Sequence, residues 1–103
     1  MDFQRYFLKL TLEAINNFIA RGKTIVDVKR VRKYYNISQS DKSKINFIWR
    51  SLELLEKIGF ITKYLNKTPK IYKLPSKIIK IENVMGDTSG DTSITIINEK
   101  GIL

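Results

Sequence analysis

The sequence predicts an α+β protein in which three helices precede a β-hairpin, followed by a short C-terminal extension with strand character. Two observations carry this prediction. Apolar residues recur at steps of three and four through residues 3–20 and 41–58, the spacing of one helix face. From residues 60 to 74 they alternate with polar residues instead, with turn residues between the two alternating stretches. A length of 103 residues suits a single domain, which we expect at residues 1–75, with the extension at 76–103.

The first predicted helix, residues 3–20, has two apolar stripes rather than one. The first stripe consists of Phe3, Phe7, Leu10, Ala14 and Phe18. The second stripe, about 100° away around the helix, consists of Leu8, Leu12, Ile15 and Ile19. A helix buried on two sides within one chain would use both stripes, whereas a dimer would use one stripe for its core and the other for a partner subunit. We adopt the second interpretation and expect the stripe that begins at Leu8 to be the dimer interface.

The second predicted helix is short and strongly basic. Residues 24–26 are largely β-branched and predict a short strand, after which Asp27 is placed to cap a helix over residues 28–35. One side of that helix carries four cations: Lys29, Arg30, Arg32 and Lys33. These residues form either a solvated basic face or a set of phosphate contacts.

The third predicted helix covers about residues 41–58. Asn36 is expected to close the preceding helix in the left-handed region, and the N-cap is one of Ser38, Ser40 and Asp41. The side expected to face the core consists of Ile45, Ile48, Trp49, Leu52 and Leu55. The opposite side consists of Ser43, Phe47, Arg50 and Leu54. We expect Phe47 to project outward, or to pack on the hairpin or a neighbouring subunit, and Leu54 to pack rather than to recognise a partner.

A β-hairpin is expected after the third helix, which Gly59 ends in a left-handed turn. Residues 60–65 and 70–74 alternate as strands. Residues 66–69 between them have the composition of a turn, so the hairpin has a basic, polar tip.

The C-terminal extension is less regular than the domain before it. Residues 78–84 and 94–97 have partial strand character. Between them lies a tandem repeat of Gly-Asp-Thr-Ser, residues 86–93, whose composition is that of a loop. We expect two partly packed strands, the alternative being a largely disordered tail.

The charge of the chain points to a polyanionic partner. The sequence contains 19 Lys and Arg against 10 Asp and Glu, a net charge of +9. Residues 1–75 carry a net charge of +10 and residues 76–103 a net charge of −1, so the basic surface belongs to the predicted domain. Nucleic acid and an anionic membrane surface both suit such a charge. Because the cations cluster on the second helix and the hairpin rather than along the amphipathic first helix, we expect nucleic acid and no membrane.

The absence of both His and Cys excludes several classes of site. A disulfide framework, a Cys/His zinc site, a cysteine nucleophile and a histidine general base are all ruled out. There is no Gly-rich phosphate loop and the acidic residues are scattered, so we expect no enzyme, metal, cofactor or small-molecule substrate. No apolar run approaches the roughly 18 residues that span a membrane, and the N-terminus lacks a signal-peptide pattern. We therefore expect a cytoplasmic protein.

The junction between the third helix and the hairpin resembles that of the winged helix-turn-helix family. Its pattern, a leucine four residues before a glycine and then two apolar residues, is matched by Leu55, Gly59, Phe60 and Ile61. The resemblance covers about residues 5–75 and includes the order of elements. In size and composition the chain is similar to small regulators of archaea and of crenarchaeal viruses and plasmids. The resemblance implies a sequence-specific, double-stranded DNA-binding transcription regulator that forms a homodimer through its first helix. We expect a repressor, because no segment looks like an effector domain and blocking a promoter needs none.

The resemblance also implies which residues contact DNA. The helix over residues 41–58 would enter the major groove, and the hairpin at 63–73, the wing, would follow the backbone or the minor groove. The DNA-binding residues expected on this basis are Lys29, Arg30, Arg32, Lys33, Ser40, Lys42, Ser43, Lys44, Asn46, Phe47, Arg50, Lys63, Asn66, Lys67, Thr68 and Lys70. The alternative is an adaptor for protein–protein contact or for plasmid or viral replication or partition, because a fold of this kind does not fix its function.

Overall fold

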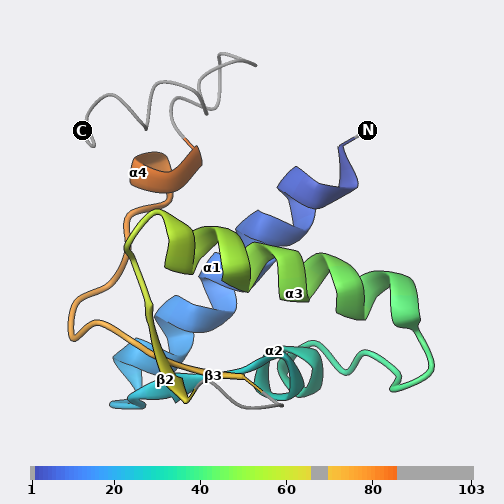
Figure 1. Cartoon of the computed structure of the whole chain (residues 1–103), viewed down its shortest axis with the longest axis horizontal. Coiled ribbons are helices and arrows are strands. Elements are labelled where there is room, and N and C mark those ends of the chain that lie inside the picture. The colour runs from blue at the N-terminus through green and yellow to red at the C-terminus, as the bar shows by residue number, and fades with distance from the viewer. Residues whose placement is uncertain (1, 66–69, 86–103) are drawn as a thin grey trace.

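The described part of the chain folds into four helices and a three-stranded antiparallel sheet, which confirms the α+β class (Figure 1). The structure is a computed structural model that describes residues 2–65 and 70–85. Its elements are α1 (Phe3–Ala20), β1 (Ile25–Val26), α2 (Val28–Tyr34), α3 (Lys42–Lys57), β2 (Thr62–Leu65), β3 (Ile71–Lys73) and α4 (Ile81–Met85). Figure 1 shows α1 and α3 crossing in the middle of the molecule, with the sheet and α2 below them and α4 above.

Short polar side chains and left-handed residues fix the helix ends where the sequence predicts them. Asp2, Asp27 and Asp41 each accept a hydrogen bond from the backbone N–H three residues later, at 3.1, 2.8 and 3.3 Å. The predicted cap at Asp27 is therefore confirmed, and Asp41 is the N-cap among the three candidates for α3. Asn36, after α2, has φ +59°, and Gly59, after α3, has φ +96°, which confirms both predicted left-handed terminators.

The sheet is a hairpin with one extra edge strand. Its order is β1-β3-β2, all antiparallel, so β3 lies in the centre. Tyr72 of β3 pairs with Val26 of β1 on one side and with Lys63 of β2 on the other, and its side chain is buried. The predicted strand at residues 24–26 is thus confirmed, and it connects the loop after α1 to the hairpin.

The core is built around α1, and it buries the second apolar stripe of that helix together with Phe7 and Ala14 of the first, whereas Phe3 is 54% exposed. Leu8, Leu12, Ile15 and Ile19 are at most 9% exposed within the single chain. The expectation that they form a dimer interface is wrong. The reason is the position of α1, which packs against α3 and also contacts α2 and α4, so that the chain itself covers the second stripe.

Residues 78–84 do not form the predicted strand. The backbone of Ile79 is held by the amide of Asn16, which donates to its carbonyl and accepts from its N–H, both at 2.8 Å. The next residues turn into α4, where the neighbours Val84 and Met85 are both buried. A strand would direct adjacent side chains to opposite faces, so the helical turn allows both to enter the core. Ile79, Val84 and Met85 thus share one core with the predicted domain; the repeat at 86–93 and the segment 94–97 lie outside the described residues.

Candidate nucleic-acid interface

The four cations of α2 divide into two pairs with different roles. Arg30 forms an ion pair with the buried Asp27, Nη1 to Oδ2 at 2.7 Å, and Arg32 donates to the carbonyl of Ile37 at 3.0 Å. These two guanidinium groups therefore hold the start of α2 and the turn toward α3. Lys29 and Lys33 are exposed, and neither forms an ion pair with any described residue. The basic surface that α2 offers to a partner consists chiefly of these two lysines.

One row of polar side chains runs along the exposed side of α3. Lys42, Asn46 and Arg50 follow one another at four-residue steps, which is about one helical turn, and all three are exposed. Ser43 is exposed beside this row. We call Lys42, Asn46 and Arg50 the α3 row.

Two other predicted residues near the start of α3 do not belong to the row. Lys44 stands about 120° around the helix from Arg50 by the 3.6-residue period, and its Nζ lies 3.3 Å from Asp41 Oδ2. Ser40 lies in the turn before α3, where its hydroxyl is 2.8 Å from that of Ser38. The structure therefore brings together only part of the predicted set on this helix.

Phe47 is turned away from the α3 row and packs on α1. Its ring stacks on that of Phe7, with centroids 5.4 Å apart, and lies 6.3 Å from that of Phe3. The expectation that Phe47 projects outward is wrong, because the N-terminal half of α1 offers it an aromatic surface. Leu54, on the same flank, packs against the core as predicted.

Trp49 is exposed on the other flank of α3, contrary to its predicted place in the core. Its side chain is 39% exposed, whereas Ile48, Leu52 and Leu55 are fully buried. Trp49 stands about 100° from Ile48, on the side toward α2. Because α2 has only 7 residues, it leaves this flank of α3 partly uncovered.

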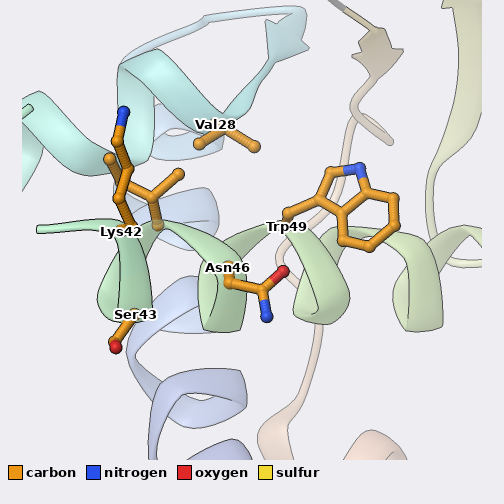
Figure 2. Close-up of a pocket in the computed structure, with 6 residues that line it drawn as sticks. Val28, Lys42, Ser43, Asn46 and Trp49 are labelled. Carbon is orange, nitrogen blue, oxygen red and sulfur yellow. The ribbon is translucent and has the colours of Figure 1, made fainter.

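A shallow hollow lies beside Trp49, between α3 and the start of α2 (Figure 2). Its volume is about 680 Å³. The residues that line it are Val28, Lys42, Ser43, Ile45, Asn46 and Trp49. Sequence reasoning missed this site, although one signal was present: Trp49 follows Asn46 by three residues, so the two are neighbours on the helix surface.

The wing is only partly described. Lys63 on β2 is exposed, and Lys70, just before β3, lies 3.6 Å from Glu53 Oε2, Nζ to oxygen, which links the wing to α3. Asn66, Lys67 and Thr68 lie outside the described residues.

The described residues contain no group of three or more Asp, Glu, His or Cys side chains that is placed to hold a metal ion. None of the described helices combines the length and the apolar character needed to cross a membrane.

In comparisons with known proteins, no protein-family model, curated protein or solved structure matches the chain.

Proposed function

We propose that the protein is a winged helix-turn-helix regulator that binds double-stranded DNA. The single observation that carries the proposal is the α3 row, an exposed line of Lys42, Asn46 and Arg50 with no described acidic partner, next to a helix with two unpaired lysines. The described elements support it further, since α1, α2 and α3 precede the β2–β3 hairpin in the order that this architecture requires. Of the DNA contacts expected from the sequence, the proposal keeps those whose side chains are exposed and not held by other described residues.

In the proposed complex the α3 row enters the major groove. An Asn amide pairs bidentately with adenine and an Arg guanidinium with guanine, which gives Asn46 and Arg50 roles in reading base edges. Lys29 and Lys33 of α2, and Lys63 of the wing, neutralise phosphates and fix the position of α3 without reading sequence. Arg30 and Arg32 contribute indirectly by holding the start of α2 and the turn toward α3.

We propose further that two copies act together as a repressor. One recognition helix reads few base pairs, and a dimer brings two such helices about one DNA turn, ~34 Å, apart. Since the Leu8 stripe is buried, the contact is assigned to the N-terminal end of α1, where Phe3 and Tyr6 are 54% and 48% exposed. Sedimentation at tens of micromolar tests this contact: a wild-type monomer contradicts it, and Tyr6→Glu is expected to shift a wild-type dimer to monomer.

The DNA-binding proposal is tested by the salt dependence of binding to a fluorescent 30-bp duplex. Each phosphate contact contributes about 0.9 to the slope of log K against log salt, so the variant Lys29→Ala/Lys33→Ala is expected to lose about 1.8 of that slope. The matched control is Lys77→Ala/Lys80→Ala, which removes the same charge from two exposed lysines outside the proposed interface. Equal slopes for the two variants, or no binding at low salt, would contradict the proposal and favour the adaptor alternative.

A further inference from the structure

The hollow beside Trp49 combines an apolar wall with a polar rim. The apolar lining, here called the wall, consists of Val28, Ile45 and Trp49, and the polar lining, here called the rim, includes Asn46 and Lys42. Among the described residues no other aromatic ring packs on Trp49, whereas Phe3, Tyr6 and Tyr34 each contact a neighbouring ring. The hollow therefore leaves a large apolar surface uncovered in the middle of the proposed DNA-reading helix.

The chemistry of the major groove offers one apolar group that suits such a wall. Thymine presents its C5-methyl group there, and the other three bases present only hydrogen-bonding groups and ring carbons. Adenine, its partner, presents the donor and acceptor pair that an Asn amide matches. A wall of Val28, Ile45 and Trp49 beside Asn46 thus matches both strands of A·T pairs.

The spacing on α3 allows both contacts at once. Asn46 and Trp49 are three residues apart, which puts their Cβ atoms about 5–6 Å from each other. Successive base pairs are about 3.4 Å apart, so the two side chains reach the same or adjacent pairs. Lys42, at the same rim, carries a positive charge that can neutralise a neighbouring phosphate.

We infer that the Trp49 hollow receives the C5-methyl group of thymine while Asn46 pairs with adenine, so that this part of α3 selects A·T pairs. The inference rests on the proposed function and deepens it, because it assigns a preference for particular base pairs to the hollow as well as to the α3 row. An unstacked base of single-stranded DNA, lying flat on the indole, is the competing occupant.

The test begins with 30-bp duplexes enriched from a random pool by the wild-type protein. The enriched duplexes are expected to share at least one A·T step. Replacing thymine by deoxyuridine at that step removes only the methyl group, and wild-type affinity is expected to fall about fourfold for each methyl group removed from the hollow. This comparison uses the unaltered protein, so it does not depend on the folding of any variant.

Three variants assign the effect to the hollow. Trp49→Ala and Val28→Thr are expected to reduce the ratio of thymine to deoxyuridine affinity toward one, the second by placing a hydroxyl in the apolar wall without changing its shape. Ile78→Ala removes an exposed apolar side chain from the segment between β3 and α4 instead, outside the proposed interface, and is expected to keep the ratio.

The outcomes separate the inference from the proposed function. Equal affinity for thymine and deoxyuridine duplexes, enrichment of duplexes without a shared A·T step, or tighter binding to single-stranded oligothymidine would overturn the inference while DNA binding stands. Absence of binding to every duplex at low salt would overturn both.

Discussion

The two long helices, α1 and α3, are both amphipathic, yet the rest of the chain covers them to very different extents. On α1, Leu8 and Leu12 of the second stripe and Ala14 of the first are buried, while Phe3 at the N-terminal end is 54% exposed. On α3, Ile48 and Leu55 are buried while Trp49 and the α3 row remain exposed. A wide apolar arc therefore does not by itself mark a surface for a partner. Whether the arc is exposed depends on the elements that pack beside it.

The difference follows from the neighbours of each helix. α1 contacts α2, α3 and α4, and the C-terminal segment is tied to it by the two hydrogen bonds between Asn16 and Ile79. α3 packs against α1 and α2, and α2 is too short to cover the flank at Trp49. The buried helix supports the fold, and the half-covered helix is available for recognition.

The largest expected effect comes from comparing a buried residue of α1 with an exposed residue of α3. Leu12→Ala is expected to destabilise the protein by about 2–5 kcal/mol, because Leu12 is fully buried and its truncation leaves a cavity. Asn46→Ala, on the exposed side of α3, is expected to change stability by no more than about 0.5 kcal/mol and to weaken DNA binding. Denaturant unfolding and duplex titration of both variants provide the measurement.

The opposite pattern would break the comparison. If Leu12→Ala remains as stable as wild type and instead changes the oligomeric state in sedimentation, α1 has an open stripe after all. If Asn46→Ala unfolds at much lower denaturant, α3 depends on its outer side for stability.

Local chemistry explains what could be predicted from the sequence. The ends of α2 and α3 were predictable because Asp27 and Asp41 satisfy free N–H groups within three residues, and Asn36 and Gly59 accept a left-handed backbone. These effects involve only neighbours in the chain, so a single sequence contains them.

Contacts between distant segments explain what could not be predicted. Residues 78–84 had the composition of a strand, but the partner of Ile79 is a side chain 63 residues earlier. Phe47 and Trp49 occupy opposite flanks of α3, and only the positions of α1 and α2 decide which ring is covered. The ion pair of Arg30 with Asp27 is local, since the two are three residues apart, but the sequence analysis expected Arg30 in a solvated face or at a phosphate.

A smaller effect tests how completely α1 is enclosed. Thr11 is fully buried, and its hydroxyl has no hydrogen-bond partner among the described residues. Thr11→Val is expected to stabilise the protein by about 1 kcal/mol, because it removes an unsatisfied polar atom at constant shape.

The control for Thr11 lies on α3. The hydroxyl of Ser51, also buried, donates to the carbonyl of Phe47 at 2.9 Å and accepts from Gln4 Nε2 at 3.1 Å. Ser51→Ala is expected to destabilise the protein by about 1 kcal/mol. Urea unfolding of both variants and the wild type measures the two changes. Loss of stability in both variants would mean that the Thr11 hydroxyl is satisfied in solution.

The smallest expected effect is a pH dependence at the contact between α1 and α2. The Tyr35 hydroxyl donates to the carbonyl of Leu10 at 2.6 Å, and burial, followed by the negative charge of Glu13, raises its pKa from 10.0 to about 12. Since the folded protein holds this proton more tightly than the unfolded chain, the contribution of Tyr35 to stability is complete below pH 10 and is lost as pH rises toward 12. At neutral pH, Tyr35→Phe is expected to cost about 1 kcal/mol. The gap between wild type and variant, measured by unfolding from pH 8 to 11.5, should narrow above pH 10, and a constant gap would mean that α2 separates from α1 before the phenol ionises.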